Sequence, residues 1–404
     1  MSASEPDDID RLEQAIIQEL TRRRSRPWTV HWLVRMAGRL GTGVALGLLV
    51  PLINGCVLPR SFKEVRNPRG GAALNRHVCL VYSQRYQINL GGFEKLHPFD
   101  INKYGKIYLQ LLTDGLIRSE AVYVPDEISR EDLLRAHSAA YIERLRQPEA
   151  VARYLEAGFA SVLPAWVADA SILTPFRYAT GGTLLAARLA LQHGIAINLG
   201  GGYHHAEPDR GGGFCIYADM PIAVRTLQAE GLIRRALVVD LDVHQGNGTA
   251  RCVAADDDVF AFDMHEEDIY PTPKAKNDID VPLQAGTGDE AYLGLLRKNL
   301  PDVFDRAKPH IVFFQAGADV LDGDPLAHLR LTPQGVVERD RTVIDEAVRR
   351  KVPIVMVLGG GYSKDAWRVQ YDSIRRTIEQ YGLENAAGRP YPRRPTIKER
   401  IYTK

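Results

Sequence analysis

The sequence predicts an α/β fold, a three-layer arrangement in which helices cover both faces of a mostly parallel central sheet. From about residue 75, short apolar runs rich in β-branched residues alternate with longer helical stretches. Such alternation is typical of parallel sheets, because a helix returns the chain between successive strands. No linker rich in proline and glycine interrupts this region, so we expect a single domain.

Six apolar runs predict strands, near 77–82, 195–199, 236–241, 258–263, 310–315 and 352–358. Longer stretches predict helices near 130–146, 149–160, 179–193, 219–231, 289–299, 333–350 and 363–381. The chain has 404 residues, of which 45% are hydrophobic, and this apolar content is sufficient for a large core.

Composition divides the chain into four parts. Residues 1–39 form a polar and then basic tail, residues 70–385 the folded domain, and residues 386–404 a tail rich in proline and arginine. Residues 40–59 are an uncharged apolar run that could just span a bilayer as a helix. We expect this run to attach the protein to a membrane, although a signal peptide or a helix docked on the domain fits the same pattern. Without such attachment we expect a cytoplasmic protein.

The formal net charge of +1 gives no overall attraction to nucleic acid, so we expect no direct nucleic-acid binding. The four cysteines form no CxxC pair. We interpret Cys79, Cys215 and Cys252 as reduced residues of the core.

Polar residues that could take part in catalysis or bind a ligand follow four of the predicted strands. In a parallel sheet, ligands bind beyond the carboxyl ends of the strands, so these residues are expected to meet at one edge. They are His204 and His205 after 195–199, Asp240, Asp242, His244 and Asn247 at the end of 236–241, Asp319 after 310–315, and Tyr362 after 352–358.

A metal site is the first chemistry that these residues predict. Asp242 and His244 are two residues apart, and in extended backbone such residues point the same way. Asp319 would supply a third ligand, and two carboxylates with one imidazole suit a catalytic divalent metal, usually zinc. An isolated DxDxH match is equally typical of a solvated strand end, but here three other polar clusters accompany it.

The remaining residues suit acid–base work. An imidazole titrates near neutral pH, so His204 and His205 could move protons, although an isolated HisHis pair more often belongs to an ordinary loop. Glycine triplets before and after the pair indicate tight turns that hold the loop close to a ligand. Tyr362, behind three glycines, could donate to an oxyanion.

Together, the motifs GGYHHA, DLDVHQGNG, GADVLDGD and GGGY, in this order, resemble the histone deacetylases. The stretches 81–106, 209–219, 244–248 and 269–271 resemble the class IV branch. The resemblance extends from about 77 to 375. It implies an arginase-like α/β fold, one catalytic zinc ion, for which Fe²⁺ could substitute, and a structural potassium ion.

The resemblance also implies roles for individual residues. Asp242, His244 and Asp319 match the metal ligands, and His204, His205 and Tyr362 match the catalytic histidines and tyrosine. Asp240 matches the residue that bonds the first histidine and borders the potassium site, to which Asp263 and Met264 would also contribute. The substrate-binding positions match Gly213, Phe214, Tyr270 and Leu326.

Two departures from the class I pattern stand out. Gln245 replaces a second histidine after His244, as in class IV. Asn247 stands where class I has an aspartate that supports the second histidine of the pair. A neutral partner should raise the basicity of His205 less than a carboxylate would.

The expected function is zinc-dependent hydrolysis of the amide bond of acylated lysine. The class IV resemblance adds long acyl chains to the expected substrates. An acylpolyamine amidohydrolase would use the same chemistry on small acylated amines. A ureohydrolase with two metals would need further aspartates, which DVHQG and GADVLDGD do not provide. An inactive acyl-lysine-binding module would be expected to have lost at least one of these residues.

Overall fold

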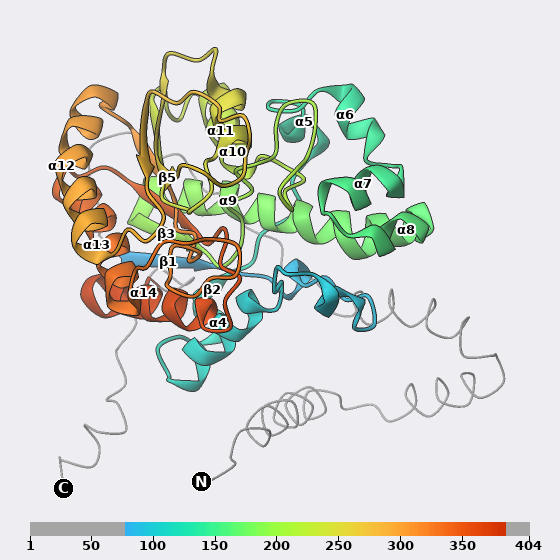
Figure 1. Cartoon of the computed structure of the whole chain (residues 1–404), viewed down its shortest axis with the longest axis horizontal. Helices are drawn as coiled ribbons and strands as arrows, with labels where there is room; N and C mark the ends of the chain where they lie inside the picture. Colours follow the sequence, from blue (N-terminus) through green and yellow to red (C-terminus); the bar gives the residue numbers. More distant parts are fainter. Residues whose placement is uncertain (1–76, 385–404) are drawn as a thin grey trace, which may run out of the picture. The chain divides into compact units, whose positions relative to one another are not determined.

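The computed structural model describes residues 77–384, which form one compact unit. An eight-stranded sheet forms its centre, with the order β2-β1-β3-β8-β7-β4-β5-β6, and all its neighbouring strands run parallel. Figure 1 shows the sheet with helices packed around it. The strands are β1 (His77–Val81), β2 (Val122–Tyr123), β3 (Gly194–Asn198), β4 (Ala236–Asp240), β5 (Val259–Glu266), β6 (Ile279–Leu283), β7 (Ile311–Gln315) and β8 (Ile354–Val357).

All six predicted strands are confirmed, and they form the middle of the sheet. Every residue of β3, β4, β7 and β8 is buried, as expected for strands covered on both faces. The sequence did not predict the two edge strands. β2 has only two residues, while β6 is half-exposed and contains Pro282, so neither has the composition of a central strand.

Helices cover both faces of the sheet. Helix α9 (Thr174–His193) packs against β1, β3 and β8, while α13 (Pro333–Arg349) contacts β8 and α14 (Ala366–Tyr381) contacts β1. The chain thus has the predicted arginase-like α/β architecture. The other helices are α4 (Lys103–Thr113), α5 (Arg130–Leu133), α6 (Ala139–Arg144), α7 (Pro148–Tyr154), α8 (Ala165–Ala168), α10 (Asp219–Ala229), α11 (Asn247–Val253) and α12 (Asp289–Ala307).

Some predicted helix bounds were wrong. The helix expected over 130–146 is two short helices, because the Ser138 side chain caps a new start by accepting from the amide of Tyr141. The stretch 149–160 is α7 followed by a 3₁₀ turn, Gly158–Val162, and α12 continues past Pro301 to Ala307. The sequence did not predict α4 or α11.

Several sequence expectations concern residues that the structure does not describe. The tails 1–39 and 386–404, the apolar run 40–59 and the expected limits 70 and 385 all lie outside the described residues. Between residues 77 and 384, no helix combines the length and apolarity needed to cross a bilayer. Cys79, Cys215 and Cys252 are free thiols, as predicted.

Candidate active site

The predicted site residues meet at the carboxyl ends of four adjacent strands, β3, β8, β7 and β4. Parallel pairing aligns the strand ends, since Asp240 of β4 pairs with Gln315 of β7, which pairs with Val357 of β8. His204, His205, Asp242, His244 and Asp319 are all buried in the loops that follow. The site therefore forms because short loops leave neighbouring strands at the same edge.

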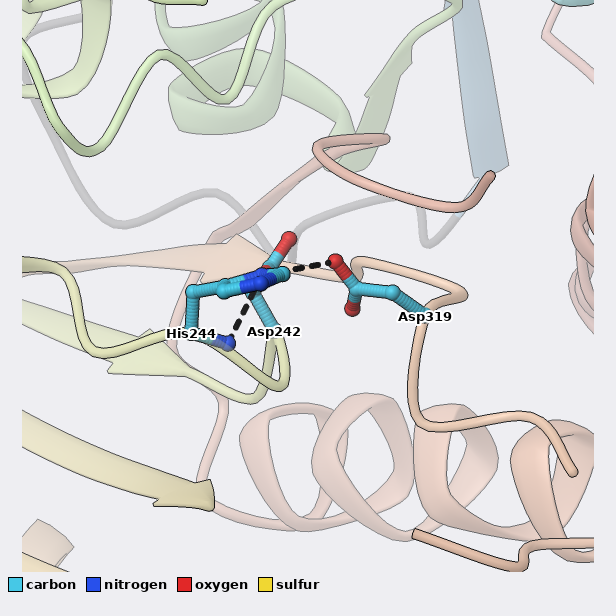
Figure 2. A group of neighbouring side chains, drawn as sticks. All are labelled: Asp242, His244 and Asp319. Carbon is cyan, nitrogen blue, oxygen red and sulfur yellow. Dashed lines mark hydrogen bonds and ion pairs between the residues drawn. The ribbon is translucent and has the colours of Figure 1, made fainter. Parts of the chain in front are cut away.

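Asp242, His244 and Asp319 form a compact group of donor atoms, all within 4.8 Å of one another (Figure 2). The Nδ1 atom of His244 lies 3.3 Å from Oδ1 of Asp242 and 3.3 Å from Oδ2 of Asp319. Backbone amides hold the other carboxylate oxygens: that of Gly360 donates to Asp242 over 2.8 Å, and that of Val243 to Asp319 over 2.9 Å. Two oriented carboxylates and one imidazole fit a single divalent ion.

The electrostatics of this group favour a cation. Burial opposes protonation of His244, but Asp242 and Asp319 outweigh it and raise its pKa to about 10. Burial, with the nearby Asp242, raises the pKa of Asp319 to about 6. For Asp242 burial is outweighed by His204 and His244, which hold its pKa well below its usual range. The two carboxylates thus compete for positive charge that a metal ion can supply.

Two glycines allow the carboxylates to sit so close to the backbone. A Cβ on Gly360 would lie 2.0 Å from Oδ2 of Asp319, and one on Gly317 would lie 2.1 Å from Oδ2 of Asp242. Neither position can hold a side chain without displacing a carboxylate. The glycines in GGGY and in GADVLDGD therefore serve the acidic group as well as the turns.

The two histidines have different supports. Nδ1 of His204 lies 2.9 Å from Oδ2 of Asp240, and Nδ1 of His205 lies 2.7 Å from Oδ1 of Asn247. Burial opposes the charge of His204, but Asp240 and Asp242 outweigh it and raise its pKa to about 9. Burial, together with the neighbouring His204 and His244, lowers the pKa of His205 well below its usual value. The surroundings of the two rings therefore act in opposite directions, favouring the charged form of His204 and the neutral form of His205.

Tyr362 lies over the donor group. Its ring centroid is 6.1 Å from that of His244, at an interplanar angle of 88°. Asp324 accepts hydrogen bonds from the backbone amides of Tyr362, over 2.7 Å, and Ser363, over 3.1 Å, and so fixes the turn. Burial and the nearby Asp319 raise the pKa of Tyr362 well above its usual value, so its hydroxyl keeps its proton.

The predicted substrate-binding residues surround this group. Phe214 packs edge-on to Tyr362 at 5.9 Å, and Tyr270 packs edge-on to His205 at 4.8 Å. Gly213 has a φ of 51°, and a Cβ there would lie 2.4 Å from Cδ2 of His205, so only glycine fits. Tyr270 is 44% exposed and Leu326 is 37% exposed, which places both at the solvent side of the site.

A comparison with protein-family models matches residues 97–378 to the histone deacetylase domain. The chain belongs to the histone deacetylase family. It is 40% identical over 306 residues to histone deacetylase 2 of Arabidopsis thaliana, covering 75% of this chain and 79% of that protein. It is 31% identical over 284 residues to a probable deacetylase of Archaeoglobus fulgidus, covering 66% and 77%. The solved HD domain of HDA15 shares the fold, with a TM-score of 0.60 at 19% identity, over 77% of this chain and 92% of that one.

This histone deacetylase family member is therefore a hydrolase that acts on amide bonds. Gln245, the residue after His244, does not join the donor group. Its Nε2 donates to the carbonyl of Ala275 over 2.9 Å and to Oδ1 of Asp280 over 2.8 Å, and its Oε1 accepts from the amide of Ala275 over 2.7 Å. Gln245 thus anchors the loop that carries Tyr270.

At the expected potassium site, the carboxylate of Asp263 contacts a histidine and a backbone amide. Oδ1 of Asp263 lies 2.7 Å from Nδ1 of His265, and its Oδ2 accepts from the amide of Gly246 over 2.9 Å. Asp263, His265 and Asp280 also have donor atoms within 4.8 Å of one another. Asp240 of β4 pairs with Asp263 of β5, and Met264 follows Asp263 in the same strand. Asp240 and Met264 are both buried.

Sequence reasoning missed several residues that support the site. Nζ of Lys103 donates to the carbonyls of Gly359, over 2.6 Å, and Gly360, over 2.8 Å. Arg339, which is fully buried, donates to the carbonyls of Leu241, over 2.9 Å, and Gly317, over 2.6 Å. Lys103 lies in the stretch 81–106 that resembles class IV, and Arg339 lies in none of the quoted motifs, but no local pattern places either side chain under loops so distant in sequence.

Proposed function

We propose that this protein is a zinc-dependent hydrolase that removes acyl groups from acylated lysine. The observation that carries the proposal is the juxtaposition of the Asp242–His244–Asp319 group with two histidines, one bonded to Asp240 and one to Asn247, and with the ring of Tyr362. Each has a distinct task in amide hydrolysis, in which a water must lose a proton, an oxyanion must be stabilised and an amine must gain a proton.

Asp242, His244 and Asp319 would hold the metal ion. When bound there, a divalent ion supplies Lewis acidity, which polarises a carbonyl group and lowers the pKa of water. The chemistry of the donor set agrees with zinc, for which carboxylate oxygen and imidazole nitrogen are both ordinary ligands, and with Fe²⁺ as an alternative. A structural potassium ion beside Asp240, Asp263 and Met264 is part of the same proposal.

His205 is the proposed general base. Its Nδ1 is engaged by Asn247, so Nε2 is the nitrogen left to accept a proton from the attacking water. The lowered pKa keeps the imidazole neutral and ready to accept. The same nitrogen would later deliver the proton to the leaving amine.

His204 and Tyr362 are proposed to stabilise developing negative charge. His204, with its raised pKa and its bond to Asp240, supplies a positive charge beside the reacting group. Tyr362 keeps its hydroxyl proton and can donate it in a hydrogen bond to the oxyanion, a contribution of about 2.7–4 kcal/mol in comparable sites.

The aromatic side chains around the site favour a narrow, linear substrate. Phe214 and Tyr270 flank Tyr362 and His205, where they could pack on both sides of the methylene groups of a lysine. The class IV resemblance extends the proposal to long acyl chains. An acylpolyamine has the same linear shape, so a small acylated amine is the alternative substrate.

Fluorogenic peptides carrying acyl-lysine with chains of several lengths, assayed beside acetylputrescine, test this proposal. We expect hydrolysis of at least one acyl-lysine peptide, loss of it on treatment with a chelator, and recovery on adding zinc. The Asp319→Ala protein, which is expected to lose the metal, serves as the inactive control. If the protein hydrolyses acetylputrescine but none of the acyl-lysine peptides, its substrate is an acylated polyamine and not acylated lysine.

A further inference from the structure

Glu207 lies behind His205 and Asn247, and none of the roles above uses it. Its side chain is only 11% exposed, and its Oε1 accepts a hydrogen bond of 2.9 Å from Nδ2 of Asn247. Oδ1 of the same Asn247 lies 2.7 Å from Nδ1 of His205. The three side chains therefore form one continuous series of hydrogen bonds that ends at the histidine.

Two arginines and the backbone hold Glu207 in place. Arg210 donates through Nη2 to Oε1 over 2.9 Å and through Nε to Oε2 over 3.0 Å, and Arg251 of α11 also donates to Oε1. The backbone amide of Glu207 donates to the carbonyl of Arg210 over 2.8 Å. These contacts therefore hold the Glu207 carboxylate in position independently of its hydrogen bond with Asn247.

The amide of Asn247 has two ends of opposite character, an oxygen that accepts and an NH₂ group that donates. A carboxylate only accepts hydrogen bonds, so Glu207 requires the NH₂ end to face it. The oxygen must then face His205, and it can be bonded only if Nδ1 of that ring carries a proton. A neutral imidazole with a proton on Nδ1 has a bare Nε2.

A reversed Asn247 would have the opposite effect. Its NH₂ group would donate to Nδ1, and the ring proton would have to move to Nε2, where it would block proton uptake. An aspartate at this position would need no such control, because both of its oxygens accept. The asparagine needs a second residue to choose its orientation, and Glu207 is placed to do so.

We propose that Glu207 is a positioning residue that fixes the orientation of the Asn247 amide and thereby the tautomer of His205. The effect of Glu207 on the reaction rate rests on the proposed function, in which Nε2 of His205 is the base. The effect of Glu207 on the tautomer of His205 does not depend on that function, and the two effects can be measured separately.

The experiment uses the full-length, zinc-loaded protein labelled with ¹⁵N-histidine. Nitrogen chemical shifts distinguish a protonated ring nitrogen from a bare one, and the His205 signals are those absent from His205→Ala. We expect a proton on Nδ1 in the unaltered protein and a mixture of tautomers in Glu207→Ala. Glu207→Gln, which preserves the volume, should also give a mixture, because its amide can present a donor to Asn247. An unchanged tautomer in both variants overturns the proposal, whatever the substrate.

The rate gives a second readout. Glu207→Ala should reduce kcat by about 10- to 100-fold, in the range typical of residues that orient a catalytic group, with KM and zinc content close to those of the unaltered protein. In an Asn247→Asp background, the same substitution should cost little, because the aspartate has no wrong orientation. An equal loss in both backgrounds would mean a merely structural role and would overturn the proposal.

Glu346→Ala is the matched control. Glu346 is also largely buried, at 13% exposure, and also binds two arginines, Arg349 and Arg350, but it lies on α13. This variant should retain both the His205 tautomer and kcat. If the unaltered protein has the expected tautomer but hydrolyses no acyl-lysine or acylpolyamine, the proposed function fails while the role of Glu207 stands.

Discussion

Nδ1 of His244 lies 3.3 Å from Oδ2 of Asp319, although the two residues are 75 apart in the sequence. Their strands, β4 and β7, are neighbours in the sheet, and the loops that follow bring the two side chains into contact. At this distance a cation between the two side chains would be shared by both. The geometry thus makes the proposed metal site depend on residues from two separate segments.

Asp319→Ala should remove bound zinc and activity together, because one of the three donors disappears and the fixed geometry offers no substitute. Metal analysis of the purified protein and a chelator-competition titration would measure this. Asp322→Ala, an exposed residue of the same loop, is the control and should retain zinc. Full zinc occupancy in Asp319→Ala would exclude that residue from the ligand set.

Tyr362→Phe should leave KM nearly unchanged and reduce kcat by roughly two orders of magnitude, as expected for the loss of one oxyanion donor. The phenyl ring retains the packing against Phe214 and His244, so the fold should be unaffected. Steady-state kinetics on the best acyl-lysine peptide would decide. An unchanged kcat would show that the tyrosine is only a packed aromatic.

His205→Ala should lose more activity than His204→Ala, because the neutral histidine is the proposed base and the cationic one stabilises charge. Both variants should retain zinc, so metal content separates a loss of chemistry from a loss of the ion. The reverse order of activities would assign the proton transfer to His204, with its carboxylate partner Asp240.

The rate should fall as the pH rises through the pKa of His204, which Asp240 and Asp242 raise to about 9 against the effect of burial, and which a metal ion held by Asp242 would lower. The sign follows from the raised pKa: the cation is present below this pH and disappears above it. Asp240→Asn removes one of the two anions and should move this alkaline loss of kcat to lower pH. A profile of kcat against pH for both proteins is the measurement, and an unmoved alkaline limb would contradict the role of Asp240.

Residues 40–59 are proposed to attach the protein to a membrane and to be dispensable for catalysis. A protein truncated to begin at residue 70 should be soluble and active, while the full-length protein should fractionate with membranes. If the truncated protein aggregates and the full-length protein is soluble without detergent, the apolar run packs on the domain, because its removal exposes apolar surface. Membrane flotation and size-exclusion chromatography distinguish these results.

The sequence by itself determined the central sheet and the composition of the site. The middle strands are apolar on both faces, so each can be recognised in the sequence as a continuous run of apolar residues, such as Ile354–Val357. The polar residues that follow these runs had to meet at one edge, because parallel strands end together. For this reason Asp242, His244 and Asp319 could be placed near one another before any distance was known.

Only the tertiary structure decided how those residues are oriented and charged. The pKa values of His204 and His205 move in opposite directions because their neighbours differ, and most of those neighbours come from the segment 240–247, some 40 residues later in the chain. The orientation of Asn247 depends on Glu207, 40 residues earlier in the chain. Local sequence fixes hydrophobic period and chain direction, whereas burial and hydrogen-bond partners arise from contacts between distant segments, which no local pattern encodes.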